Sequence, residues 1–143
     1  MKLFTIGFTR RSAEAFFTTL AASRAQRLVD VRLNNSSQLA GFSKRDDLRY
    51  FLQAICHMDY LHVPDLAPTQ ELLDQYRSSK DWPAYERLFL GLLAERQVEN
   101  KVTREVIDGS CLLCSEFTAE KCHRRLVAEY LRDKWGDLAI VHL

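Results

Sequence analysis

The sequence predicts a single-domain α/β protein, residues 1–143, with three α/β/α layers and a mostly parallel, Rossmann-like sheet of about five strands. Short β-rich apolar runs alternate along the chain with segments of helical periodicity, which is the pattern of βαβ units. The length of 143 residues fits one domain with its own hydrophobic core. A hydrophobic content of 47% and a charged content of 27% are typical of a soluble globular protein.

The N-terminal segment predicts a strand followed by a helix. Residues 2–8, KLFTIGF, form a short apolar run of strand-forming residues. Ser12 is a suitable N-cap for the helix that follows, which carries its apolar stripe on Phe16, Phe17 and Leu20.

Two more strands and one more helix are predicted before residue 65. RLVDVRL at 27–33 is the second strand, and YLHVP at 60–64 is the third. Between them, a turn rich in Asn, Ser and Gly precedes a helix over 46–57. Ser43 and Asp46 resemble the capping box that opens a helix.

The segment 64–107 is mostly helical by its periodicity. Thr69 is placed to cap a helix over 70–79, and Pro83 fits the first turn of a second helix. Apolar residues of this segment that are candidates to cover a site or meet a partner are Leu66, Trp82 and Tyr85.

The C-terminal segment predicts a buried strand, a helix and a last strand. SCLLC at 110–114 is the buried strand, and AIVHL at 139–143 is the last one. Thr118 is placed to cap the helix between them, which runs to about Trp135. Right-handed crossovers would bring the C-terminal ends of the parallel strands to one edge, where ligands bind in α/β proteins.

Composition limits the classes of partner. The net charge of +1 gives no overall argument for binding to nucleic acid. Residues 1–58 hold 9 Lys and Arg against 4 Asp and Glu, so a basic surface in the N-terminal part stays an alternative. No apolar run approaches the ~20 residues of a membrane helix, and the start MKLFTIGFTRR is unlike a signal peptide. We therefore expect a cytoplasmic protein with no membrane partner, and four cysteines that are free thiols or ligands rather than disulfides.

The segment CLLCSEFTAEKCHRR, residues 111–125, concentrates reactive side chains at the predicted ligand edge. Cys114 ends a strand that leads toward a helix N-terminus, where the helix dipole and free N–H groups favour a thiolate. It is the candidate nucleophile, with Glu116 and His123 as candidate acid–base groups. A core cysteine is equally consistent with the pattern, because cysteine is among the most buried residue types.

Two arginines are candidates to hold an anion at this edge. Arg32 ends an apolar strand and Arg124 follows the His123 position, and a guanidinium can bind phosphate or carboxylate through two N–H groups. Structural alternatives stay open: Asp30 is in phase with Arg32 and predicts an ion pair. Arg124 could likewise pair with Glu116 or Glu120. Further candidate ligand-binding residues in the turns after the strands are Thr9, Asn34, Ser37 and Thr69.

The spacing of the cysteines argues against other thiol chemistries. A phosphatase loop needs Cys and Arg six positions apart, and Glu120 occupies that position after Cys114. Sulfur-transfer domains of the rhodanese type also have a strand ending in Asp-Val-Arg and a cysteine at the end of a later strand. The loop after Cys114, however, lacks the compact anion-binding loop that such domains have around their cysteine. For a zinc site, Cys111 and Cys114 would face opposite sides of a strand. Cys122 and His123, adjacent in a helix, would diverge by ~100°. The sequence therefore indicates no metal site and no cofactor.

Several segments resemble a known family. TIGFT at 5–9, LVDVR at 28–32, GFSK at 41–44, and LLCSE with CHR within 112–124 are similar to the bacterial and archaeal domain of unknown function 488, over essentially the whole chain. Many relatives have Thr-Ile-Gly-His-Ser in the first strand, and Phe8 stands here at the histidine position. The resemblance implies a small α/β domain, no particular reaction, and a site built from Arg32, Cys114, Glu116, Cys122, His123 and Arg124.

Three hypotheses about function follow. The favoured one is a small enzyme, or enzyme-like protein, acting on a small anionic ligand through the Cys/Glu/His/Arg site. The second is a nucleic-acid or nucleotide-binding module, and the third is a purely structural Cys/His/Arg cluster. The sequence leaves open the substrate, the reaction, the oligomeric state and the effect of Phe8 on any activity.

Overall fold

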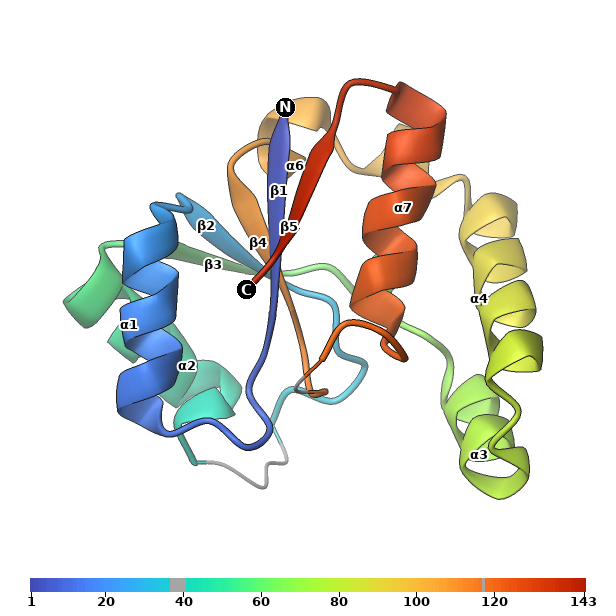
Figure 1. Cartoon of the computed structure of the whole chain (residues 1–143), viewed down its shortest axis with the longest axis horizontal. Helices are drawn as coiled ribbons and strands as arrows, with labels where there is room; N and C mark the ends of the chain where they lie inside the picture. Colours follow the sequence, from blue (N-terminus) through green and yellow to red (C-terminus); the bar gives the residue numbers. More distant parts are fainter. Residues whose placement is uncertain (37–40, 117) are drawn as a thin grey trace.

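The structure, a computed structural model, describes residues 1–36, 41–116 and 118–143 and contains a five-stranded sheet in which every pairing is parallel. The strands follow the order β3-β2-β4-β1-β5, so β4 returns between β2 and β1 (Figure 1). The predicted strands are present and the α/β fold class is confirmed, with these bounds: β1 (Lys2–Gly7), β2 (Arg27–Asp30), β3 (Asp59–His62), β4 (Ser110–Cys114) and β5 (Ala139–His142).

One face of the sheet is covered by the helices that follow β1 and β2 (Figure 1). These are α1 (Ala13–Ser23) and α2 (Arg45–Phe51), and a π-helical turn (Leu52–Cys56) continues α2. A short 3-10 turn (Gly41–Ser43) precedes α2. Helix and strand side chains form one apolar cluster on this face, which includes Ile6, Phe16, Phe17, Leu20, Leu28, Leu48, Cys111 and Leu113.

The opposite face is covered by α7 (His123–Trp135), and α4 (Trp82–Arg96) packs outside α7 (Figure 1). α3 (Gln70–Ser79) lies at the end of the sheet where the strands finish, beside the start of α4 (Figure 1). Shorter helical turns are Pro64–Leu66, α5 (Val98–Lys101) and α6 (Arg104–Ile107). The apolar cluster of this face includes Leu3, Val29, Phe89, Leu93, Leu112, Leu126 and Val127.

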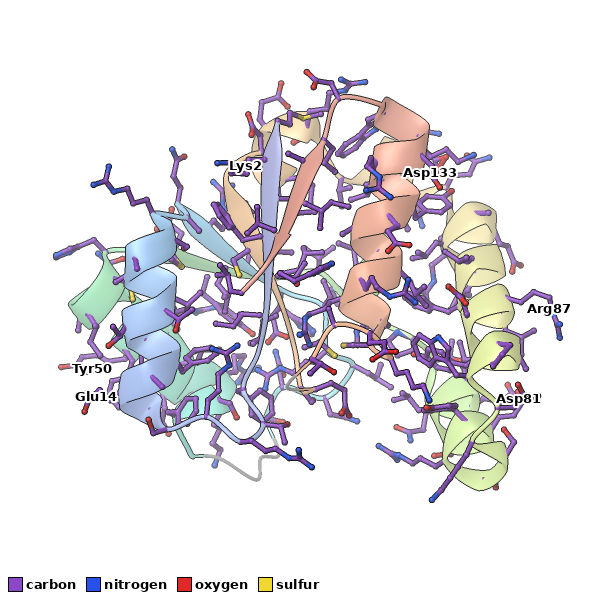
Figure 2. All side chains as sticks on the ribbon, viewed as in Figure 1. Lys2, Glu14, Tyr50, Asp81, Arg87 and Asp133 are labelled. Atoms are coloured by element: carbon purple, nitrogen blue, oxygen red, sulfur yellow. The ribbon has the colours of Figure 1, made fainter. Side chains whose placement is uncertain are left out.

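Exposed charged side chains of the helices point away from the sheet, whereas Arg124 near the start of α7 is buried. Figure 2 shows Glu14 of α1, Arg87 of α4 and Asp133 of α7 pointing outward, and all three are exposed. This division of polar and apolar faces is the amphipathic pattern expected of helices on a sheet. Within the described ranges, no helix combines the length and the apolar character that a membrane crossing requires.

Several predicted helix ends are confirmed. The Ser12 side chain accepts a hydrogen bond from the Ala15 N–H and caps α1. The Thr69 side chain accepts one from the Leu72 N–H and caps α3, which spans the predicted residues. Pro83 lies in the first turn of α4, as predicted.

Two predicted helix starts are wrong. The N-cap of α2 is Lys44, so Ser43 and Asp46 do not form the opening box. The last helix begins at His123 rather than after Thr118. The backbone just after β4 is hydrogen-bonded to the turn that follows β1, so it does not start a helix there. The Thr9 N–H and hydroxyl both donate to the Ser115 carbonyl oxygen, at 3.0 and 2.5 Å. This non-local tie is invisible to helix-capping rules.

The connections around β4 create a crevice. The chain leaves β1 and β2 toward the α1 and α2 face, whereas it leaves β4 toward the α7 face. Because β4 lies between β1 and β2, the loops at its end separate from those on both sides. In open α/β sheets, such a switch of direction is where ligands bind.

Candidate functional site

A thiol and an imidazole meet at the end of β4. Cys114 is the last residue of that strand and His123 is the first residue of α7, so the loop between them brings both side chains to the same point. The Cys114 Sγ lies 3.2 Å from the His123 Nδ1. Both residues are more than nine-tenths buried, at 5% and 7% exposure.

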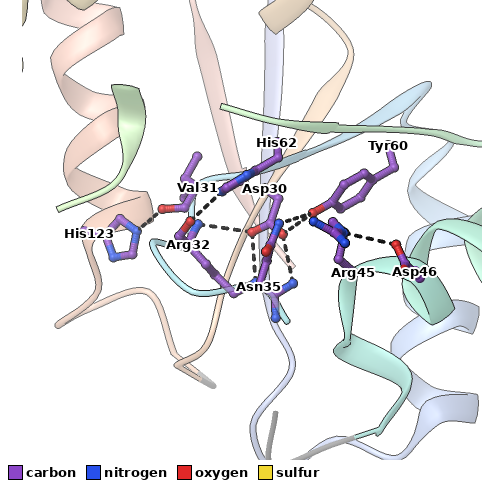
Figure 3. A network of polar contacts seen from close by, with 9 residues as sticks. All are labelled: Asp30, Val31, Arg32, Asn35, Arg45, Asp46, Tyr60, His62 and His123. Carbon is purple, nitrogen blue, oxygen red and sulfur yellow. Dashed lines mark hydrogen bonds and ion pairs between the residues drawn. The ribbon is translucent and has the colours of Figure 1, made fainter. Parts of the chain in front are cut away.

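The imidazole of His123 has a fixed orientation and tautomer. Its Nε2 lies 2.7 Å from the main-chain oxygen of Val31 (Figure 3). A carbonyl oxygen only accepts hydrogen bonds, so Nε2 carries the proton and Nδ1 presents its lone pair to Cys114. Val31 is itself held by its N–H bond of 3.1 Å to the Leu113 carbonyl. Phe89 packs edge-on against the imidazole, with ring centroids 5.6 Å apart.

The surroundings of Cys114 favour its thiolate. Burial alone would raise the pKa of this thiol, since a buried charge loses its hydration. The Cys122 thiol and the Ser115 backbone N–H donate hydrogen bonds to it and lower its pKa. The positive charge of Arg124 and the backbone N–H of Glu116 act in the same direction. The net result is a pKa below the ordinary value of a thiol, as a nucleophilic cysteine requires.

The other three thiols behave in the opposite way. Burial raises the pKa of Cys111, which lies in the cluster under α1. Burial and a hydrogen bond to Cys114 raise the pKa of Cys122 well above its ordinary value. Cys56 is half-buried, and burial raises its pKa as well. All four cysteines are free, and Cys114 alone among them has a lowered pKa.

Cys122 completes a compact group of donor atoms. Its sulfur, the Cys114 sulfur and a ring nitrogen of His123 lie within 4.8 Å of one another. The expectation that Cys122 and His123 diverge is wrong, because Cys122 is the extended N-cap residue of α7, with φ −140° and ψ 140°, and is not helical. Cys111 faces the other side of the sheet from Cys114, as predicted.

Arg32 forms the ion pair that its phase with Asp30 predicted. Its Nε and Nη2 donate to the two carboxylate oxygens of Asp30 at 2.9 and 2.8 Å (Figure 3). The Tyr60 hydroxyl donates to the same carboxylate at 2.5 Å, and the His62 Nε2 lies 2.8 Å from the Arg32 carbonyl. Arg32 stacks over the Phe8 ring and is 4% exposed. Its Nη1 has no hydrogen-bond partner among the described residues, although the side chain lines the pocket described next.

A pocket of about 530 Å³ opens beside the thiol at this edge of the sheet. Phe8, which carries no proton-transfer group, forms part of its wall. Lys121 and Cys122 of the loop before α7 also line it. Of the residues proposed from the sequence, the pocket brings together Thr9, Arg32, Asn34, Cys114, Glu116 and His123.

Two sequence candidates, Arg124 and Thr69, lie elsewhere, and a third falls outside the described residues. Arg124 is 1% exposed; its Nη1 donates to the Glu116 carbonyl oxygen at 2.6 Å, and its Nε lies 3.3 Å from the Thr5 hydroxyl. These contacts fasten the loop after β4 to β1, and Arg124 is absent from the described lining of the pocket. Thr69 caps α3 and borders a separate hollow between α3 and α4. Ser37 lies outside the described residues.

The pocket has an aromatic wall that the sequence showed only in part. Trp82 and Tyr85, named from the sequence as candidates to cover a site, line it, whereas Leu66 is fully buried in the core. Tyr76 of α3 also lines the pocket and was missed. The sequence feature that could have identified Tyr76 is its position near the end of the predicted helix 70–79, a few residues before Trp82. Both rings therefore lie at the junction of two helices.

These features define an α/β protein with an oriented thiol–imidazole pair in the wall of a pocket at the ligand edge of a parallel sheet. A family model described as "Domain of unknown function DUF488" matches residues 12–131. The chain belongs to this family, and the resemblance drawn from the sequence motifs is confirmed. Comparison with curated proteins and with solved structures gave no match.

Proposed function

We propose that this protein is a thiol-dependent enzyme in which Cys114 attacks an electrophilic centre of a small ligand held in the pocket. The observation that carries the proposal is the 3.2 Å approach of the Cys114 Sγ to the His123 Nδ1, with the other ring nitrogen committed to the Val31 carbonyl. A nucleophile beside a base, with the base oriented by a third group, is the recurring arrangement of covalent catalysis.

The proton has a defined path. The Nδ1 of His123 accepts the proton of the Cys114 thiol, which leaves a thiolate next to an imidazolium. The backbone N–H groups of Ser115 and Glu116 stabilise that thiolate. When a bond to the ligand forms, the imidazolium can return the proton to the leaving group. This path assigns the base role to His123, and Glu116, an exposed residue of the pocket lining, is left to contact the ligand.

The ligand is proposed to carry a negative charge. The Nη1 of Arg32 is a donor on a side chain that lines the pocket, and the Asp30 carboxylate holds the guanidinium in place through its other two nitrogens. A guanidinium fixed in this way can bind an anion without losing further side-chain freedom. The structural hypothesis accounts for Arg124, but it gives no reason for a thiol with a lowered pKa in the wall of a pocket.

Alkylation across pH tests the nucleophile. We expect iodoacetamide to modify Cys114 with a half-maximal rate at a pH below about 8.5, the ordinary midpoint of a thiol, because its pKa is lowered. The rate rises with pH as thiolate forms, so the lowered pKa moves the whole profile toward acid. Peptide mass spectrometry separates Cys114 from Cys56, which is only half-buried. A midpoint at or above that of Cys56 would remove the nucleophile from the proposal.

Two histidine variants control this measurement. His123→Ala removes the base and is expected to slow alkylation of Cys114 at neutral pH by at least about tenfold, a smaller factor than the ~10²–10⁴-fold that a general acid or base typically contributes to catalysis. His62→Ala is the matched control, since His62 also bonds a main-chain oxygen just after β2, that of Arg32, but has no described contact with the thiol. Equal rates in the two variants would show that His123 does not activate Cys114.

A metal centre is the second candidate, favoured by the three donor atoms within 4.8 Å. Two thiolates and one imidazole are a known ligand set for catalytic zinc, with a fourth position for water or substrate. The Val31 carbonyl would then serve as the outer partner that fixes the ligating ring.

Cys122→Ser separates the two candidates. A zinc centre predicts that purified protein mixed with Zn²⁺ retains one equivalent through gel filtration, and that Cys122→Ser weakens binding by about tenfold or more. The thiol mechanism predicts no stoichiometric retention and alkylation of Cys114 within a few-fold of the parent, because a serine hydroxyl can donate the same hydrogen bond. Metal analysis and the alkylation rate together decide between them.

A further inference from the structure

The pocket beside Cys114 has one wall made of aromatic rings. Tyr76 comes from α3, and Trp82 and Tyr85 come from the first turns of α4. Trp82 and Tyr85 are stacked, with centroids 5.2 Å apart and planes 25° from parallel. Tyr76 contacts both rings, with centroid distances of 5.7 and 5.1 Å. The wall is therefore a preassembled aromatic surface rather than a set of mobile side chains.

This wall is open to a ligand on one side. Tyr85 is 4% exposed and packs on Phe89 behind it, while Trp82 and Tyr76 remain partly exposed. Phe89, which is fully buried behind the wall, in turn contacts the imidazole of His123, so packed rings connect the wall with the reacting pair. A flat, apolar group lying on Trp82 would bury aromatic surface that water now covers.

Cationic groups stand near the same wall. Arg77 follows Tyr76 on α3, and its 3.7 Å approach to Asp74 is between two exposed side chains. Lys121 is exposed, lines the pocket and has no ion pair with any described residue. Arg32 contributes the Nη1 donor beside the thiol. Glu116 is the acidic residue of the described lining, so positive groups outnumber it.

We infer that the ligand of this site is a planar aromatic anion: its ring lies on the Tyr76–Trp82 wall, and its phosphate or carboxylate faces Arg32 and Lys121. The inference rests on the proposed function, because it places the ligand over Cys114. Stacking on an aromatic platform and charge-assisted hydrogen bonding are both strengthened where water is partly excluded. A volume of about 530 Å³ lies within the range of pockets that enclose ligands of this size.

Protection of Cys114 from iodoacetamide tests the inference. Each rate is expressed relative to the rate of the same variant without ligand. We expect AMP, 4-hydroxybenzoate or both to slow alkylation at neutral pH, with half-protection at a concentration at least about tenfold lower than for adenosine or ribose 5-phosphate. Protection by AMP only assigns a phosphate, by 4-hydroxybenzoate only a carboxylate, and by both the shared chemistry. Equal protection by a molecule that lacks the ring or the charge, or no protection at all, overturns the inference.

Two variants locate the ligand on the proposed surfaces. Trp82→Leu should weaken protection by the protecting probe at least about fivefold through loss of stacking, and Lys121→Gln should weaken it severalfold through loss of charge. Arg87→Gln, on the outward side of α4 (Figure 2), is the matched control and should not alter it. Unchanged protection in both pocket variants would contradict the inferred placement.

A tryptophan signal keeps the inference separate from the proposed function. In Trp135→Phe, Trp82 is the remaining tryptophan. Each probe should therefore quench its fluorescence, and the ranking of the probes by affinity should match their ranking in protection of Cys114. Slow alkylation of Cys114 together with quenching would overturn the thiol mechanism and support the aromatic-anion site. Fast alkylation with neither protection nor quenching would overturn the site and leave the thiol mechanism standing.

Discussion

Replacing Asp30 by alanine is expected to lower the free energy of unfolding by about 3–5 kcal/mol, the cost of breaking a buried ion pair by removing one partner. Asp30 is fully buried and binds two nitrogens of Arg32, which is 4% exposed. Without the carboxylate, the guanidinium keeps its charge but has lost its hydration and its partner. The Tyr60 hydroxyl also loses its acceptor. Urea denaturation followed by circular dichroism measures the change.

Two variants make this prediction specific. Asp46→Ala removes an acidic partner from another arginine, Arg45 (Figure 3), and both of these side chains are exposed to solvent. Water replaces that partner, so the free energy of unfolding should stay nearly unchanged. Adding Arg32→Met to Asp30→Ala removes the stranded charge and should recover part of the lost stability. If the double variant is no more stable than Asp30→Ala, the loss does not come from an unpaired guanidinium.

The fold was predictable because its strands and helices are encoded locally. The strand β4 reads SCLLC, and the helix α3 begins at a threonine that caps it, so neighbours in sequence decide both elements. Alternation of these elements then implies a parallel sheet with all strand ends at one edge. The start of α7 was not predictable in the same way, since non-local hydrogen bonds from Thr9 to Ser115 and from Arg124 to Glu116 hold the loop that precedes it.

The candidate site was predictable in its residue types more than in their pairing. The sequence placed Cys114, His123 and Arg32 at the ligand edge, and the pocket contains all three. It did not show that His123 bonds the Val31 carbonyl, because main-chain acceptors leave no mark on the sequence. Arg124 likewise donates to a backbone oxygen, that of Glu116, whereas charge alone suggested a glutamate carboxylate.

The sequence indicated the aromatic wall only in part, because Trp82 and Tyr85 were candidates to cover a site and Tyr76 was not. Tyr76 and Trp82 belong to the long segment between β3 and β4, whose helices fold back toward the strand ends. Aromatic residues in a helical pattern usually indicate a core. In the structure, α3 lies at the end of the sheet (Figure 1), and both rings line the pocket.

Substituting Gly7 by alanine should disturb the loop that carries the reactive thiol. A Cβ at Gly7 would lie 1.5 Å from the Glu116 carbonyl oxygen and 2.9 Å from the Arg124 Nη1, so the loop backbone must move. The hydrogen bond between those two groups, at 2.6 Å, would be lost or reshaped. We expect the free energy of unfolding to fall by about 3 kcal/mol, the upper end of ordinary overpacking costs. Thermal and urea unfolding measure it.

The same substitution at Gly91 gives a control with the opposite sign. Gly91 lies within α4, and a Cβ there would meet nothing within 4 Å. Alanine should therefore raise the free energy of unfolding by about 0.5–1 kcal/mol through helix propensity. Gly7→Ala should also shift the alkylation profile of Cys114 toward alkaline pH, because the displaced Ser115 and Glu116 N–H groups no longer stabilise the thiolate. A stable Gly7→Ala protein with an unshifted profile would show that this loop does not tune the thiol.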